Sequence, residues 1–543
     1  MIDYFESSVR IHPSETFFTF VEHDSTTISY TYWQARLVSA SLARRLQAAG
    51  FRSGDIVSID LPNGPEFVFV ALACAYCGFT MALFDHGLSE PERASRILEI
   101  ERSGRRIACH IDEALASQLL RNVRRLPADE SEIVRGIYSP PRHDRAIMGA
   151  DQDAIDDTVH FAERESHLFD RNAIAVIVFD GGKGQGRDKR LDKFVAVPLT
   201  WANLLDASAM ANDSLAAGAV RLWQERLPLN SINLTESGRI TRLSPEAVWQ
   251  CALPLSWVDG FQVMVRSLVA RSPFRLYTGR DVEPILCDSE RGIVSHIAVN
   301  DALLQDILTV EEWRADAIPG IASRLAQYRC VILIGRVNNA RTIMRAYELG
   351  CRIFASYGLP QTSGTVATAL MTEESHGGIV PMEGYELRIV DPDEDGLGRL
   401  SVRGPGVFGG YLNTRTAFTV DHFFITDEKA FEQDGYIYVC NRSDNMFVSA
   451  GQNIYPAEIA DVLRHVAGVS GVHVFGVPDA RSGMLPIAVI ERSDPSLTAD
   501  TIETLTRQWF SSITAPISVF VFDQLPRTSQ GRLDRGAIEA IFR

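Results

Sequence analysis

The sequence predicts an α/β protein with a large N-terminal body of several subdomains, built on mainly parallel sheets, followed by a small mobile α+β domain. Its 543 residues are too many for one hydrophobic core. Continuous apolar runs at 174–179 and 331–335 suit central strands of parallel sheets, which are buried on both faces. The segment 434–458, in which strand-like runs flank a charged stretch, is interpreted as the joint between the two bodies.

The composition is that of an ordinary globular protein, with 46% hydrophobic and 22% charged residues. A net charge of -16 argues against a nucleic-acid partner and against anchoring to an anionic membrane. The eight cysteines are scattered, and the first residues lack the basic and apolar pattern of a signal peptide. We therefore expect a protein of the reducing cytoplasm.

A run of 18 residues without a charge, Phe67–Phe84, reaches the lower limit for a membrane span. Gly78 divides the run and polar residues flank it, so we expect a buried helix that continues into a buried strand, and no membrane span. Cys74 and Cys77 form a C-x-x-C pair in this run. No second ligand pair accompanies them, which favours buried thiols over a zinc site.

Residues 26–114 have the pattern of α/β units. An amphipathic helix is expected at 35–49, and Gly54-Asp55 turns into a strand at 56–58. Residues 116–170 carry little pattern, and their acidic stretch 151–157 indicates a surface excursion.

A stretch rich in glycine and lysine, 180–190, follows the apolar run 174–179. The chain has 49 arginines and only four lysines, and three of the lysines, Lys183, Lys189 and Lys193, lie within eleven residues that overlap this stretch. Backbone N–H groups and ammonium charges that follow a strand can hold phosphate. Two interpretations stay open: a phosphate-binding loop that includes Gly182, and a solvated basic loop.

The joint starts with a strand at 436–440, passes through a charged stretch, and ends in a helix that opens near Pro456. We place the domain boundary inside it, so that the body spans 1–443 and the C-terminal domain spans 444–543. The C-terminal domain is expected to hold helices and strands at 457–465, 472–477, 487–491, from 499, and at 517–522.

The motifs, in their order along the chain, resemble those of the adenylate-forming superfamily. This family comprises acyl-CoA synthetases, the adenylation domains of non-ribosomal peptide synthetases, and luciferases. The matching stretches include Leu-Pro-Leu at 253–255, Tyr357-Gly358, Arg442-Ser443-Asp444 and Leu-Pro-Arg-Thr at 525–528. The resemblance covers nearly the whole chain and implies an enzyme whose C-terminal domain rotates between two half-reactions.

The resemblance also implies roles for particular residues. Tyr357-Gly358 corresponds to the adenine platform, and Asp427 and Arg442 correspond to ribose contacts. A turn cap is the alternative role for Asp427, because the glycine that precedes the family aspartate is missing. The implied hinge is Asp444, and Gly451 lies on the face that meets the thiol acceptor.

Three groups that handle phosphate in the family are altered in this chain. The phosphate loop has lost its hydroxyls, the glutamate that helps to hold Mg²⁺ is replaced by Gln361, and the terminal lysine is replaced by Arg532. An amide is a poorer ligand for a hard dication than a carboxylate, so no metal ligand is assigned. Arginine keeps the charge but has a larger, planar geometry. The catalytic candidates are Arg532, Gln361 and Lys189.

The acyl pocket is predicted around the stretch that follows Leu-Pro-Leu. Trp257 stands where the family has a histidine or an aromatic residue, and core packing is its alternative role. Asp259 has two interpretations, recognition of a substrate amine or an exposed turn. Gly260 and Gly335 complete the predicted pocket.

Three functional hypotheses follow. The first is a ligase that activates a small carboxylic acid with ATP, with or without Mg²⁺, and passes the acyl group to CoA, to the phosphopantetheine of a carrier protein, or to an amine. The second is an acyl transferase that uses a preformed adenylate or thioester. The third is a non-catalytic binding subunit that retains the family fold.

Overall fold

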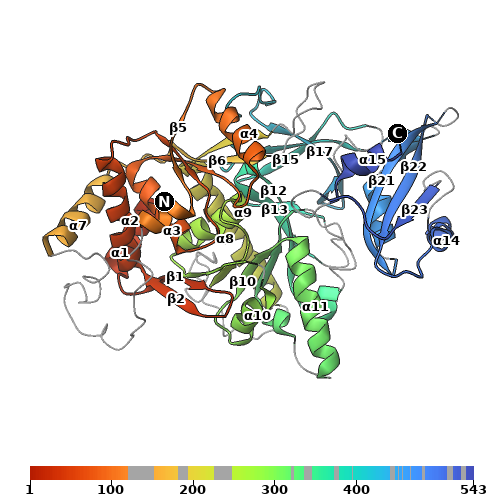
Figure 1. The fold of residues 1–543 in the computed structure, drawn as a ribbon, viewed down its shortest axis with the longest axis horizontal. Coiled ribbons are helices and arrows are strands. Elements are labelled where there is room, and N and C mark those ends of the chain that lie inside the picture. The colour runs from red at the N-terminus through yellow and green to blue at the C-terminus, as the bar shows by residue number, and fades with distance from the viewer. Residues whose placement is uncertain are drawn as a thin grey trace. The chain divides into compact units, whose positions relative to one another are not determined.

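The computed structural model describes residues 1–119, 152–180, 194–224, 248–279, 281–318, 323–335, 345–371, 378–393, 396–440, 447–449, 452–454, 456–464, 466–479, 483–509, 518–527 and 533–542 (Figure 1). The chain forms two compact units. The first comprises Met1–Val337, Thr342–Leu387 and Val402–Phe424, and the described part of the second lies within Arg388–Ser401 and Ile425–Arg543.

A nine-stranded sheet forms the centre of the first unit. Its strand order is β14-β13-β12-β11-β10-β8-β9-β1-β2. The strands from β12 to β1 run parallel, and antiparallel strands close both edges. The bounds are β1 Thr16–Val21, β2 Thr27–Thr31, β8 Trp249–Cys251, β9 Phe274–Tyr277, β10 His296–Val299, β11 Cys330–Leu333, β12 Ile353–Leu359, β13 Gly364–Leu370 and β14 Val380–Pro381.

A five-stranded sheet accompanies it, with the order β5-β3-β4-β6-β7. All of its neighbours are parallel except β7, which runs antiparallel to β6. The bounds are β3 Ile56–Ile59, β4 Thr80–Leu83, β5 Ile107–Ile111, β6 Ile174–Asp180 and β7 Val195–Thr200. The apolar run 174–179 thus forms a strand inside a mainly parallel sheet, which confirms the predicted fold class.

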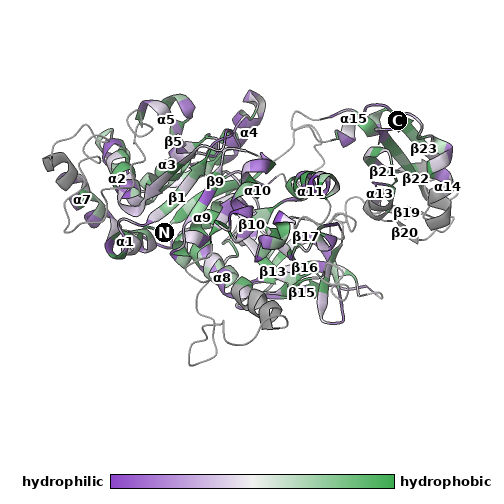
Figure 2. Cartoon of the chain, turned by 90° about the horizontal axis from the view of Figure 1, so that it is seen from below, coloured by the Kyte–Doolittle hydropathy of each residue, from purple (hydrophilic) through white to green (hydrophobic). Residues whose placement is uncertain are grey.

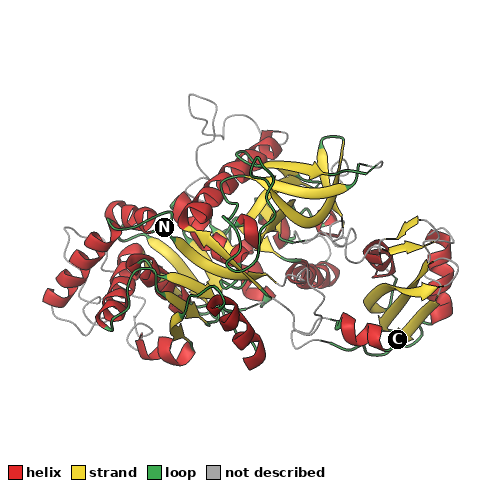
Figure 3. Cartoon of the chain, turned by 90° about the horizontal axis from the view of Figure 1, so that it is seen from above, coloured by secondary structure: helices red, strands yellow, loops and turns green. Residues whose placement is uncertain are grey.

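Helices cover the faces of these sheets (Figure 3), and the strands between them are largely apolar (Figure 2). Their bounds are α1 Ile2–Ile11, α2 Tyr32–Ala48, α3 Pro65–Cys77, α4 Glu90–Glu101, α5 Glu113–Leu119, α7 Gln152–Ser166, α8 Trp201–Gln224, α9 Val258–Ala270, α10 Val282–Glu290 and α11 Asp301–Ala317. Two short 3-10 helices, η4 Arg324–Gln327 and η5 Pro360–Thr362, lie in connections.

The charge-free run Phe67–Phe84 is a buried helix and strand, as predicted. Helix α3 ends at Gly78, which adopts a left-handed backbone with φ of 66°, and β4 follows. Cys74 and Cys77 are buried in this helix as free thiols. None of the helices that the structure describes has the length and hydropathy needed to cross a membrane.

The prediction of a surface excursion over residues 116–170 is wrong for its second half, because Gln152–Ser166 form the helix α7. Thr158, Phe161 and Ala162 are buried at helical spacing, although acidic residues surround them. Arg44 of α2 donates to the Thr158 hydroxyl at 2.8 Å. This contact packs the helix against α2, and the local composition did not reveal it.

A four-stranded sheet, β15-β16-β17-β18, comprises Glu386–Val390, Gly398–Arg403, Phe424–Gln433 and Tyr436–Cys440. The small C-terminal α+β domain follows it. Its strands lie in the order β20-β19-β22-β21, and β23 pairs with β22. The strands are β19 Phe447–Ser449, β20 Gln452–Ile454, β21 Val469–Asp479, β22 Gly483–Arg492 and β23 Ser518–Phe522. The helices are α13 Pro456–Arg464, α14 Ala499–Trp509 and α15 Arg535–Ala540. The predicted boundary at residues 443 and 444 lies outside the described residues and stays a prediction.

A buried ion pair fixes the N-terminal helices to one another. Arg36 of α2 donates to the Glu6 carboxylate of α1 at 3.0 Å, and the Tyr76 hydroxyl of α3 donates to the same oxygen. All three side chains are buried. A charged pair in this position depends on both partners, because removal of one leaves a buried charge unpaired.

We expect Arg36→Met to lower the free energy of unfolding by about 3–5 kcal/mol, because Glu6 loses its cation in a water-poor site. The double variant Glu6→Gln/Arg36→Met should lose less, since no unpaired charge remains. Arg171→Met breaks an exposed pair with Asp206 (2.7 Å) and should cost only about 0.2–1 kcal/mol. Urea unfolding checks the order; an Arg36→Met loss no larger than that of Arg171→Met contradicts it.

Candidate active site

The turn after β12 brings two backbone segments into close contact. A Cβ on Gly358 would overlap with the carbonyl of Gly364, so only glycine fits at this point. The Thr362 hydroxyl accepts from the Leu359 N–H at 2.9 Å and donates to the Gly364 carbonyl at 2.8 Å. Tyr357, which precedes this turn, is mostly buried. The turn is therefore rigid, as a platform for a planar ligand requires.

Gln361 lies in this turn and reaches the end of β6. Its amide nitrogen donates to the Asp180 carboxylate at 2.8 Å and to the Tyr411 hydroxyl at 3.1 Å. The side chain is only 2% exposed, and its amide oxygen is buried with no hydrogen-bond partner among the described residues. Asp180 was not among the residues predicted for the site. Its position directly after the apolar run, where the glycine-rich stretch begins, was the available signal.

The predicted acyl-pocket residues lie at the start of α9. Trp257 is the N-cap residue of the helix and is half-buried. Gly260 passes so close to the carbonyls of Leu253 and Pro254 that a Cβ would overlap with them. This approach explains why glycine follows the Leu-Pro-Leu motif.

Asp259 lies in the first turn of α9 and is half-buried, so the interpretation as an exposed turn residue is wrong. Burial raises its pKa from 3.8 to about 6, because the charged form loses solvation, and Arg266 opposes the shift in part. A Cβ on Gly364 would lie 3.3 Å from an Asp259 carboxylate oxygen. Asp259 therefore faces the turn that contains Gln361.

A second contact ties α9 to this turn. Gln262 donates to the Ser363 carbonyl at 2.7 Å, and the Ser208 hydroxyl of α8 donates to the Gln262 side chain. Both residues are buried. The structure thus brings together the predicted adenine platform, Gln361 and the first turn of α9.

A buried arginine of α4 contacts the described chain ends on either side of residues 181–193. The Arg96 guanidinium lies 5.3 Å from the ring centre of Phe179 and 4.7 Å from that of Phe194. It also donates to Asp85 at 2.9 Å, and Asp85 accepts from the Ser256 hydroxyl at 3.1 Å. Arg96 thereby links these ends to the residue before Trp257, a connection that sequence reasoning missed.

Of the remaining predicted residues, the structure describes Gly335 and Asp427. Gly335 is exposed after β11 and has a φ of 83°, a left-handed conformation that glycine adopts easily. Asp427 is exposed within β17, so its alternative role as a turn cap is wrong. Seven predicted residues lie outside the described residues: Gly182, Lys183, Lys189, Arg442, Asp444, Gly451 and Arg532.

The side chains at the end of β6 fit the chemistry of Mg²⁺. The Asp180 carboxylate supplies oxygen atoms, which are the ligands that hard dications prefer, and the Gln361 amide nitrogen donates to it. In the described part of the chain, no group of three or more His, Cys, Asp or Glu residues forms a complete metal cage. An ion here would be shared with a phosphate ligand, as is usual for Mg²⁺.

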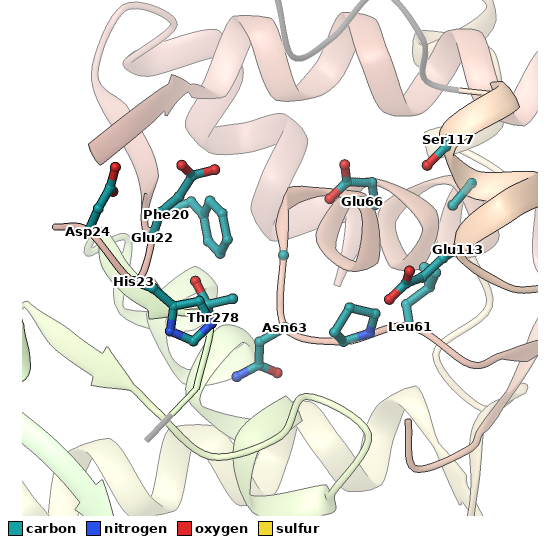
Figure 4. Close-up of a pocket in the computed structure, with 13 residues that line it drawn as sticks. Phe20, Glu22, His23, Asp24, Leu61, Asn63, Glu66, Glu113, Ser117 and Thr278 are labelled. Carbon is teal, nitrogen blue, oxygen red and sulfur yellow. The ribbon is translucent and has the colours of Figure 1, made fainter. Parts of the chain in front are cut away.

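A separate cavity of about 410 Å³ lies near the ends of β1 and β9 (Figure 4). Carboxylates surround it: Glu22, Asp24, Glu66 and Glu113. None of the predicted site residues lines it. Its acidic lining disfavours a nucleotide or another anion, so we do not assign the nucleotide site to this cavity.

Comparison with known proteins identifies the family of this chain. The profile of the AMP-binding enzyme family matches residues 5–182 and 227–412, and that of the AMP-binding enzyme C-terminal domain matches 458–532. The 2-succinylbenzoate–CoA ligase of Bacillus pumilus is 24% identical over 512 residues, which cover 92% of this chain and 90% of that protein. The corresponding ligase of Enterococcus faecalis is 28% identical over 303 residues, but the match spans only 60% of that protein.

Two solved structures share the fold. The o-succinylbenzoate CoA synthetase MenE of Bacillus subtilis, in complex with the acyl-adenylate OSB-AMP, has a TM-score of 0.71 at 21% identity, covering 99% of this chain and 97% of that one. ATP-bound MatB from Rhodopseudomonas palustris has a TM-score of 0.70 at 18% identity, covering 100% and 99%. Given the profile matches over most of its length, the chain belongs to the AMP-binding enzyme family, the adenylate-forming superfamily that its motifs predicted.

Proposed function

We propose that this protein is an AMP-forming acid–thiol ligase, which activates a carboxylic acid with ATP and transfers the acyl group to CoA. The observation that carries the proposal is the junction of the Tyr357-Gly358 turn, the end of β6 and the start of α9. This junction occurs in a chain that aligns with a CoA ligase over 92% of its length. Solved structures of MenE hold ATP with a magnesium ion, AMP, and the product analogue OSB-NCoA.

The proposed reaction has two steps. First, the substrate carboxylate attacks the α-phosphate of ATP, the bond to the pyrophosphate leaving group breaks, and an acyl-AMP forms. Then the thiol of CoA attacks the acyl carbon, AMP leaves, and the thiol proton is released. The first step brings two anions together, so positive charge must be aimed at the phosphates.

We assign the adenine platform to Tyr357-Gly358 and the ribose contacts to Asp427 and Arg442. Gly182, Lys183 and Lys189 would hold the phosphates, and Arg532 would neutralise charge at the α-phosphate. Mg²⁺, shared with the phosphates near the end of β6, would offset their charge when bound. The acyl pocket consists of Trp257, Asp259, Gly260 and Gly335.

For the second step, we propose rotation about Asp444, which would present the Gly451 face to the thiol. The domains would then be 1–443 and 444–543. We keep the cytoplasm as the proposed compartment, because cysteine thiols stay reduced there.

We expect the purified protein to release pyrophosphate from Mg-ATP with at least one member of a panel of acids that includes 2-succinylbenzoate, dicarboxylic acids and fatty acids. Release should depend on the acid, and adding CoA should yield the thioester. Reactions without acid and without CoA are the controls. AMP binding without pyrophosphate release for any acid would favour transfer from a preformed adenylate. Failure to bind AMP or ATP would favour the non-catalytic hypothesis.

We expect Arg532→Lys to increase acid-dependent ATP–pyrophosphate exchange at least about tenfold, because an ammonium fits a single phosphate oxygen better than a planar guanidinium does. Transfer from synthetic acyl-AMP to CoA should not change. Arg527→Lys, five residues earlier in the same motif, is the matched control and should not raise exchange. Unchanged exchange in Arg532→Lys would show that the arginine is adapted to its role.

We expect Asp259→Asn to become increasingly more stable than the wild type as the pH rises from 4 to 7. As the pH passes 3.8, Asp259 ionises in the unfolded chain but stays protonated in the folded one up to about 6, so the wild type loses stability over this interval. The amide of the variant does not titrate. Melting temperatures measured across this range check the divergence, and parallel curves would contradict it.

A further inference from the structure

Gln361 and Asp180 form one unit at the junction of the two sheets, and this unit contains a single carboxylate. We propose that Asp180 is the protein carboxylate that binds the Mg²⁺ of Mg-ATP, and that Gln361 is a positioning residue that orients it. This assignment rests on the proposed function and sharpens it. It transfers the metal contact from the turn after β12 to the end of β6.

The contacts of the Gln361 amide fix which of its atoms faces Asp180. The Asp180 carboxylate accepts the hydrogen bond at 2.8 Å, so the nitrogen, and not the oxygen, points toward it. The same nitrogen lies 3.1 Å from the Tyr411 hydroxyl, which holds the amide from its other side. Turning the amide to present its oxygen to a metal would place that oxygen against the carboxylate. Gln361 is therefore a donor to Asp180 in this arrangement.

The position of Asp180 suits a metal ligand. It is half-buried, whereas its donor Gln361 is only 2% exposed. Gln361 donates to one carboxylate oxygen, Oδ2, and among the described residues no hydrogen bond to Oδ1 competes with an ion. Ligating carboxylates are commonly held by a neighbouring donor of this kind. Mg²⁺ usually takes one or two carboxylates together with substrate phosphates and water, so one aspartate is sufficient.

The negative charge of Asp180 explains why position 361 holds an amide and not a second carboxylate. A glutamate at position 361 would place a second carboxylate within hydrogen-bond distance of Asp180. Two such groups cannot both ionise without a cation between them, and one pKa would rise strongly. A glutamine keeps the contact and removes the repulsion. The amide at 361 is thus the partner that a carboxylate at 180 requires.

The test measures the affinity for α,β-methylene-ATP by calorimetry, with Mg²⁺ and with EDTA, because this analogue cannot be cleaved between its first two phosphates. In the wild type, Mg²⁺ should tighten binding at least about tenfold. In Asp180→Asn, Mg²⁺ should tighten binding of the analogue by no more than about twofold, because the charge of the ligand is lost. The affinity for AMP should stay unchanged. Asparagine keeps an oxygen that accepts from Gln361, so the variant should fold.

The double variant Asp180→Asn/Gln361→Glu exchanges the two groups and should restore most of the gain from Mg²⁺. Gln361→Glu alone should lower the melting temperature without metal, and Mg²⁺ should raise that temperature more than it does in the wild type. The matched control is Asp206→Asn, which removes an exposed carboxylate of α8 and should behave as the wild type does.

Failure of the proposed function can be distinguished from failure of the Asp180 assignment alone. If the wild type binds neither AMP nor the analogue, the proposed function is wrong and this assignment falls with it. If the wild type shows the gain from Mg²⁺ and Asp180→Asn keeps it in full, only the assignment is wrong. Failure of the double variant to recover the gain, with AMP affinity intact, also overturns the exchange of roles between the two residues.

Discussion

A hydrogen bond from Gln361 to Asp180 joins the two sheets of the first unit at the ends of β12 and β6. Gln361 follows β12 of the nine-stranded sheet, and Asp180 is the last residue of β6 in the five-stranded sheet. Ligands of open α/β sheets bind outside the carboxyl ends of the strands. On the proposed function, this bond holds in place two segments that a nucleotide would contact.

The features that sequence reasoning predicted correctly are those with a local physical cause. A continuous apolar run such as 174–179 must be buried on both faces, so a strand in a parallel sheet follows directly. The close approach of the Gly364 carbonyl requires the glycine after Tyr357, a cause that the motif match alone did not give. Helix α3 and its left-handed Gly78 terminus have the same local origin.

The features that it missed depend on partners far away in the chain. Helix α7 has an acidic sequence, and the burial of its side chains against α2 is visible only in the structure. Asp259 looks like a turn residue until the packing of α9 against the Gly364 turn reduces its exposure. Asp180 and Gln361 are 181 positions apart, so neither residue alone indicates that they form a pair.

This pairing changes how the departures from the family pattern combine. Taken one by one, Gln361, Arg532 and the altered loop look like three independent losses of phosphate-handling groups. Residues in direct contact do not act independently, and the Gln361 substitution faces a carboxylate only 2.8 Å away. On the proposed assignment, the metal site keeps a negative charge through Asp180. The altered phosphate-handling groups are then only two, the loop and Arg532. Both of those groups retain positive charge, as the lysines of the loop and the guanidinium of Arg532. The electrostatic requirement for joining a carboxylate to a triphosphate is then met by charges in new positions.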